Sequence, residues 1–179
     1  MKVRTIRLIA LVSVVGLTLA MPVLSADKKK VERHHKDKYQ SVEVARFDVQ
    51  QGVNFPQDWL ITMNEAIVKQ LQETKKFKEI RREGESPADP NAPSLKLVGT
   101  VTEYKPGSRA KRYMVGFGAG ATKVKAHIKL VDRATGEVLF EDDVDGKVVM
   151  GVIGGESLGA TRGLAKEIAG KMKKEFFSS

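Results

Sequence analysis

Alternation of apolar and charged residues is most regular in residues 123–144. Apolar side chains occupy every second position from Val124 to Leu130, and charged or polar side chains stand between them. A period of two predicts a β-strand with one buried face and one solvated face. The segment Asp-Arg-Ala-Thr-Gly-Glu at 132–137 suits a three-residue loop in which Gly136 takes the left-handed conformation. The pattern therefore predicts a β-hairpin.

The loop also predicts how the two hairpin strands pair. It places Arg133 opposite Glu137, and the same register continues as alternating charged and apolar pairs. Asp142 is the exception, because it faces Ile128 on the buried side. We expect a bulge or the sheet edge to give its carboxylate access to solvent. The charged face is typical of a solvated ladder, so His127 receives no catalytic role. The further predicted pairs are Lys129 with Glu141, His127 with Asp143, Lys125 with Asp145, Leu130 with Phe140 and Ala126 with Val144.

Two longer stripes of apolar residues recur at helical spacing. They predict helices over residues 56–76 and 156–176, with Trp59 beside the first stripe and Lys171 facing water on the second. Strands are expected over 41–49, 77–82 and 95–104. The resulting order of strand, helix, strand, strand, hairpin and helix predicts an α+β fold with a mixed, mainly antiparallel sheet of about five strands and two long helices. The stripes are Leu60, Met63, Ile67 and Leu71, then Leu158, Thr161, Ala165, Ile168, Met172 and Phe176.

The amino-terminal residues differ in composition from the rest of the chain. Basic residues, an apolar run and small residues before position 26 are typical of a signal peptide over 1–26, cleaved after Ala26 or Ser25. An uncleaved membrane anchor is the alternative. Residues 27–40 form a charged, flexible linker, and residues 41–177 form a single α+β domain. Most of the formal net charge of +9 lies before the domain, so the domain is only mildly basic and nucleic acid is not expected as a partner.

The sequence contains no cysteine. Disulfides, thiol catalysis and thiolate metal sites are therefore excluded, and so is a lipid-modified cysteine after the signal peptide. We expect an exported or periplasmic protein that is soluble after cleavage and is not a lipoprotein. The adjacent His34 and His35 beside Asp37 resemble polar residues of a flexible tail more than a metal site, and no metal is predicted.

Residues 105–120 combine a basic half with a half in which glycine alternates. If this segment is extended, its glycine side carries no side chains and permits close approach of the last helix or of a partner. The spacing matches neither the dinucleotide nor the P-loop fingerprint, so no nucleotide or other cofactor is predicted. The interaction candidates are Lys105, Arg109, Lys111, Arg112, Tyr113, Gly116, Phe117, Gly118 and Gly120.

Four segments, at 98–104, 107–113, 116–120 and 130–139, resemble the bacterial family called domain of unknown function 4410. The resemblance covers about residues 40–176, and its glycine motif is the most specific part. The order of elements is more distantly similar to periplasmic parts of the curli-secretion channel family, to outer-membrane activators of penicillin-binding proteins and to TolB-like amino-terminal domains. The resemblance implies protein binding in the cell envelope without catalysis. Many such relatives are lipoproteins, and this chain departs from them by lacking the cysteine.

Three functions remain open from the sequence. The first is a non-catalytic periplasmic module for protein–protein interaction or assembly, with an envelope protein or further copies of itself as partner. The second is a binder of anionic envelope lipid or polymer through the basic loop at 105–113, which includes peripheral contact with an anionic membrane surface. The third is a hydrolase, for which no Ser-His-Asp order is present and only Glu103, Asp142 and Asp143 are candidates. We rank them in this order, and predict no catalytic residue.

Overall fold

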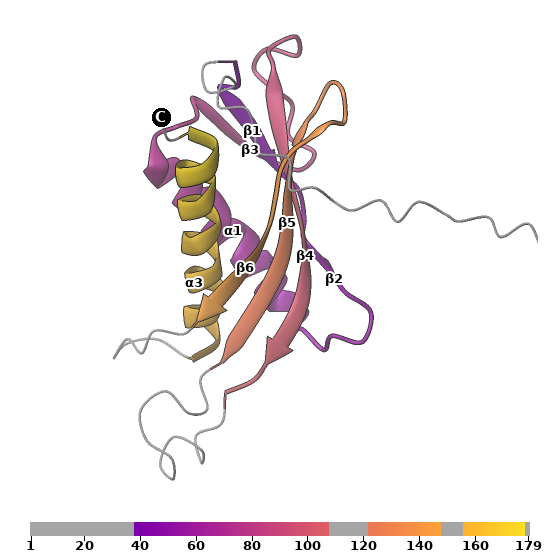
Figure 1. Cartoon of the computed structure of the whole chain (residues 1–179), viewed down its shortest axis with the longest axis vertical. Coiled ribbons are helices and arrows are strands. Elements are labelled where there is room, and N and C mark those ends of the chain that lie inside the picture. The colour runs from indigo at the N-terminus through magenta and orange to yellow at the C-terminus, as the bar shows by residue number, and fades with distance from the viewer. Residues whose placement is uncertain (1–37, 108–121, 148–155, 178–179) are drawn as a thin grey trace, which may run out of the picture. The chain divides into compact units, whose positions relative to one another are not determined.

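The computed structural model describes residues 38–107, 122–147 and 156–177, and all of them belong to the unit Val31–Ser179. They form a sheet with two helices on one of its faces (Figure 1). Among the described helices, none is long and apolar enough to cross a membrane. The strands are β1 (Ser41–Val44), β2 (Asp48–Val49), β3 (Glu79–Arg82), β4 (Ser94–Lys105), β5 (Lys123–Asp132) and β6 (Val138–Lys147), and the helices are α1 (Gln57–Thr74) and α3 (Glu156–Lys171), followed by the π-helical turn η2 (Met172–Phe176).

The strand order is β3-β1-β4-β5-β6, with β2 paired to β4 beside β1. β1 runs parallel to both of its neighbours, whereas the longer pairings of β4 with β5 and of β5 with β6 are antiparallel. The sheet is therefore mixed, with its antiparallel part formed by the three longest strands. The predicted α+β fold with two long helices is confirmed.

The predicted strand over 41–49 is interrupted in the structure. β1 ends at Val44, and the short β2 resumes pairing with β4 at Asp48. Between them the ring of Phe47 turns onto β4, where a Cβ atom at Gly99 would lie only 2.2 Å from it. The break is accompanied by this packing of an aromatic side chain on the bare backbone of a glycine, which a strand pattern in one segment does not reveal.

Both helices bury the predicted stripes against the sheet. In α1 the four predicted residues are buried, and Trp59 lies half-buried beside the core. In the second helix Ile168 is fully buried, while the predicted Leu158 and Phe176 side chains lie outside the described residues. The helix also packs closely on β6, because a Cβ atom at Gly146 would lie 2.7 Å from the Cβ of Leu164. The other predicted residues of this stripe, Thr161, Ala165 and Met172, are buried as well.

The hairpin register is confirmed from residue 123 to residue 130. The five further predicted cross-strand pairs all occur, and Gly136 has the predicted left-handed conformation with φ +74°. The predicted pairing of Arg133 with Glu137 is wrong, because a register shift follows Leu130 and brings Val131 opposite Val138. Arg133 instead contacts the carboxylate of Glu43, with its Nε 3.3 Å away.

The expectation that Lys171 faces water is also wrong. Its ammonium lies 2.5 Å from the carboxylate of Asp142, the residue that does not fit the apolar side of the hairpin. Helix α3 ends beside this position on β6, so an acidic residue on the helix side of the sheet acquires a basic partner. Both side chains are half-buried.

A second contact fixes the point where the chain enters the domain. Tyr39, inside the predicted linker, is 1% exposed, and its hydroxyl donates a hydrogen bond to the carboxylate of Asp132 at the hairpin turn. Asp132 also accepts hydrogen bonds from the backbone N–H groups of Ala134 and Thr135, at 2.8 and 3.2 Å. With the ammonium of Lys38 beside them, these donors lower the pKa of Asp132 to about 2, the Tyr39 hydroxyl being the largest cause.

Candidate functional site

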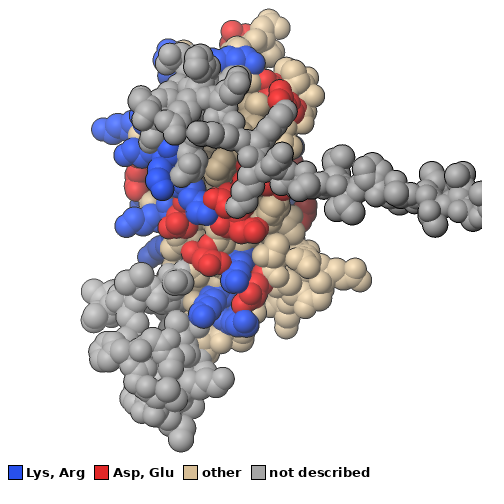
Figure 2. All heavy atoms as spheres, in the orientation of Figure 1, with Lys and Arg blue, Asp and Glu red and all other residues tan. Residues whose placement is uncertain are grey.

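We call the side of the sheet opposite α1 and α3 the outer face (Figure 1). It carries the charged side chains of β4, β5 and β6 that alternate with the buried apolar ones. On the surface seen in Figure 2, basic and acidic side chains lie next to one another and do not separate into two large patches. The outer face is therefore a surface of mixed charge, held in register by the hairpin.

His127 lies between two carboxylates of this face. Its Nδ1 lies 2.8 Å from a carboxylate oxygen of Asp143, and its Nε2 lies 2.7 Å from one of Glu141. These carboxylates raise the pKa of His127, with the hydrogen bond to Asp143 as the largest cause, because they favour the protonated ring that donates from both nitrogens. Both nitrogens are occupied, so the ring is not placed to activate a nucleophile.

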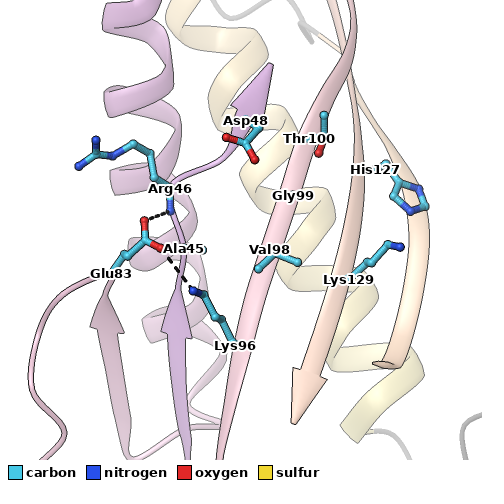
Figure 3. Close-up of a pocket in the computed structure, with 10 residues that line it drawn as sticks. All are labelled: Ala45, Arg46, Asp48, Glu83, Lys96, Val98, Gly99, Thr100, His127 and Lys129. Carbon is cyan, nitrogen blue, oxygen red and sulfur yellow. Dashed lines mark hydrogen bonds and ion pairs between the residues drawn. The ribbon is translucent and has the colours of Figure 1, made fainter. Parts of the chain in front are cut away.

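Where β1 gives way to β2, the outer face is hollowed by about 450 Å³. Figure 3 shows Val98 of β4 in the middle of the hollow, with Lys96 on the side towards β1. His127 and Lys129 of β5 lie on the other side. Glu83 accepts a hydrogen bond from the backbone N–H of Arg46 at 3.2 Å and one from Lys96 at 3.3 Å, and these donors lower its pKa, with Arg46 as the larger cause. The hollow is lined by Ala45, Arg46, Asp48, Glu83, Lys96, Val98, Gly99, Thr100, His127 and Lys129.

The hollow is an open surface feature whose ionisable side chains are partly engaged with one another. It is open to solvent, so it does not exclude water from a reacting group. Its ionisable side chains include Lys96, paired with Glu83, and His127, which is held between two carboxylates. Within the described ranges, no group of three or more His, Asp or Glu side chains is arranged to hold a metal ion.

A buried charge cluster lies beside the hollow, and it was not predicted from the sequence. The carboxylate of Glu43 lies within 3.4 Å of the Arg81 guanidinium and 3.7 Å of the Lys96 ammonium, and Arg133 completes the group. Glu43 and Arg81 are almost fully buried, so each compensates the charge of the other. The cluster joins β1, β3, β4 and the hairpin turn. Glu43 and Ser41 are two residues apart, so their side chains point to the same side of β1. This alternation of polar residues is the signal that could have revealed the cluster.

Of the interaction candidates, Lys105 is the one within the described residues. It ends β4, is well exposed, and its ammonium lies 2.7 Å from the carboxylate of Glu103. Lys125 approaches the same carboxylate at 3.4 Å, and both cations lower the pKa of Glu103, Lys105 more strongly. The other eight candidates, Arg109, Lys111, Arg112, Tyr113, Gly116, Phe117, Gly118 and Gly120, lie outside the described residues.

The fold and the outer face define a small α+β domain without catalytic geometry in its described part. Residues 26–152 match the model of the family described as "Domain of unknown function (DUF4410)". The chain therefore belongs to this family, and the resemblance predicted from its glycine motif and hairpin is confirmed. No curated protein matches the chain.

Solved structures share the fold at low sequence identity. The PelC dodecamer from Paraburkholderia phytofirmans is 18% identical, with a TM-score of 0.50 over 74% of this chain and 86% of that chain. Protein XCC0632 from Xanthomonas campestris is 11% identical, with a TM-score of 0.50 over 75% and 81%. Lipoprotein GNA1162 from Neisseria meningitidis is 17% identical, with a TM-score of 0.40 over 60% and 80%. The two structures with a TM-score of 0.50 support the fold, and the names of all three neighbours describe those proteins alone.

Proposed function

We propose that this protein is a non-catalytic interaction module of the bacterial cell envelope, exported and soluble after cleavage near Ala26. The observation that carries the proposal is the outer face, which no described helix covers and whose charges are fixed by cross-strand ion pairs. Such a face offers an ordered pattern of charge to a partner, and fixed complementary charge gives specificity in protein association. An envelope protein or further copies of this chain are the proposed partners.

One structural neighbour bears on the choice of partner. The PelC neighbour is a dodecamer, which makes homo-oligomerisation worth testing for this chain as well. The chain carries a signal-like segment and no cysteine, so attachment by lipid on a cysteine is not part of the proposal.

Site-specific photocrosslinking in the native periplasm tests the proposal. A crosslinking residue at Thr100 would lie in the hollow of the outer face, and one at Lys166 would lie exposed on α3, away from that face. We expect Thr100 to give a discrete protein adduct and Lys166 to give none or a different one. Equal adducts at both positions, or none at Thr100, would contradict the outer face as the contact surface.

A second candidate function is binding of anionic lipid or polymer through the basic loop at 105–113. The observation that favours it is the exposed end of β4, where Lys105 leads into the basic run. We expect the full chain to sediment with vesicles that contain anionic lipid, and Arg109→Ala with Arg112→Ala to weaken this binding and its salt dependence. Binding that is unchanged in the double variant, or equal with zwitterionic vesicles, would contradict this function.

The glycines of the same segment remain a proposed close-contact surface. If Gly118 packs within the protein, Gly118→Val should destabilise it by about 1–3 kcal/mol through overpacking. If Gly118 meets a partner, the variant should keep its melting temperature and lose only partner recovery. A variant that keeps both would show that Gly118 serves neither contact.

A further inference from the structure

Strand β6 is the last strand of the described sheet, and on one side no described strand pairs with it. It spans ten residues, Val138–Lys147. An edge of this length presents a row of backbone N–H and C=O groups that can pair with a strand from another molecule. Its exposed side is therefore a strand-pairing surface unless other groups occupy it.

The structure shows which backbone groups point to this edge. The N–H of Asp143 donates to its neighbour Asp142, and the carbonyl of Asp143 accepts from Lys171, so neither bond goes to β5. Residues whose backbone groups point inward and outward alternate in an antiparallel ladder. The backbone groups of Glu141 and Asp145 therefore also point away from β5, to the side on which no described strand pairs. Asp143 lies near the middle of this row.

Two side chains occupy the backbone groups of Asp143. The Oδ1 atom of Asp142 accepts the Asp143 N–H at 2.8 Å, and the Nζ of Lys171 donates to the Asp143 carbonyl at 2.8 Å. Lys171 also lies 2.5 Å from Oδ2 of Asp142, so one ion pair holds in place both side chains that bond to the Asp143 backbone. Lys171 is the last residue of α3. The hydrogen bonds at the β6 edge therefore depend on the packing of this helix.

We propose that Asp142 and Lys171 form an edge lock that prevents β6 from pairing with β6 of a second copy. A two-fold axis near Asp143 would align the two strands over most of their length, so a second copy is the occupant that could use nearly the whole edge. The side chains of Glu141, Asp143 and Asp145 would then face the same acids across the new pairing. This repulsion is a second, salt-sensitive barrier. The edge lock goes beyond the proposed function, because it concerns the edge and not the outer face.

Sedimentation velocity over a concentration series tests the edge lock. Lys171→Met keeps a long side chain but removes both bonds, so we expect larger species than the wild type forms, increasing with protein concentration and with salt. Lys171→Arg can still donate to both acceptors and should behave as the wild type does. Lys166→Met removes the same charge from an exposed position of α3 and should also match the wild type. A folded Lys171→Met that associates no more than the wild type in low or high salt would overturn the proposal.

A proline variant shows whether association uses this edge. In the Lys171→Met background, Asp145→Pro removes an outward N–H and leaves the β5 ladder intact, because the groups of Asp145 point away from β5. We expect it to return the protein to the wild-type association state. Association that persists in the double variant would come from another surface and would overturn the proposal.

Hydrogen exchange of the wild type gives a test that needs no variant. The amides of Asp143 and Asp145 both face the edge, but only that of Asp143 is bonded by the lock. We expect the Asp143 amide to exchange at least tenfold more slowly than that of Asp145, after correction for intrinsic rates. Equal exchange of the two amides would overturn the proposal, even if Lys171→Met fails to fold.

Discussion

The two faces of the sheet differ in how their side chains are held. On the helix side, Leu97, Ile128 and Leu130 are fully buried, and glycines allow ring or helix to approach the strands. On the outer face, charged pairs such as Lys129 with Glu141 remain substantially exposed. Burial of apolar area stabilises far more than exposed ion pairs do. The comparison indicates that apolar burial on the helix side contributes most to stability, while the exposed charges of the outer face contribute little and can serve to recognise a partner.

The largest effect is expected for a truncation on the helix side. Ile168 of α3 is fully buried, so Ile168→Ala should lower the free energy of unfolding by about 2–5 kcal/mol through lost burial and a residual cavity. Urea denaturation followed by circular dichroism measures this change. Lys166→Ala, on the exposed side of the same helix, should change stability by less than about 0.5 kcal/mol. Similar losses for the two variants would contradict the proposed asymmetry of the faces.

A smaller loss is expected where the helix approaches the sheet. Gly146→Ala would place its Cβ 2.8 Å from the carbonyl oxygen of Ala160, so we expect destabilisation of about 1–3 kcal/mol by overpacking. Gly170→Ala in α3 has no atom within 4 Å of the new Cβ and should stabilise by up to about 1 kcal/mol. A melting temperature that falls for Gly146→Ala and rises for Gly170→Ala would confirm the close contact. Changes in the same direction would contradict it.

These glycines also show where prediction from sequence ends. The period of two in 123–144 and the helical stripes predicted the elements, because local periodicity determines which side of each element is buried. The contacts of Gly99 with Phe47 and of Gly146 with Leu164 join segments far apart in the chain, and no local pattern encodes them. The sequence instead drew attention to the glycines at 116–120, which lie outside the described residues.

On the outer face, the pair Lys129 and Glu141 should contribute only about 0.2–1 kcal/mol. Lys129→Glu or Glu141→Lys alone should each lose about this much. The reversed double variant should recover only part of the loss, because Glu141 also contacts His127. A double-mutant cycle from urea denaturation measures the coupling, and strict additivity would contradict a direct interaction across the ladder.

The smallest effect is a dependence on pH that comes from His127. Its pKa is raised in the folded protein, so its contribution to stability is fully present below about pH 6.5. The contribution is lost as the pH rises through the folded pKa. We expect the urea midpoint of the wild type to fall across this window, and that of His127→Gln to stay flat. Parallel curves for the two proteins would show that His127 does not couple to folding.

The candidate site was predictable only in part. Alternating charges on the hairpin predicted the ladder of His127 with Asp143, since register follows from turn length and pattern. The hollow and the cluster of Glu43 with Arg81 depend on the break after β1 and on parallel pairing with β3. These are tertiary features, and the short segments involved have no periodic signal of their own.

The contact between Tyr39 and Asp132 has a mechanical consequence. A force applied to the chain ahead of Lys38 reaches the Tyr39 ring before it reaches β1, which begins at Ser41. Because the ring is buried and its hydroxyl is bonded to the hairpin turn, the load is shared between the core and the two long strands β5 and β6. A pull on the amino-terminal segment would therefore load the core and the hairpin together with β1, and not β1 alone.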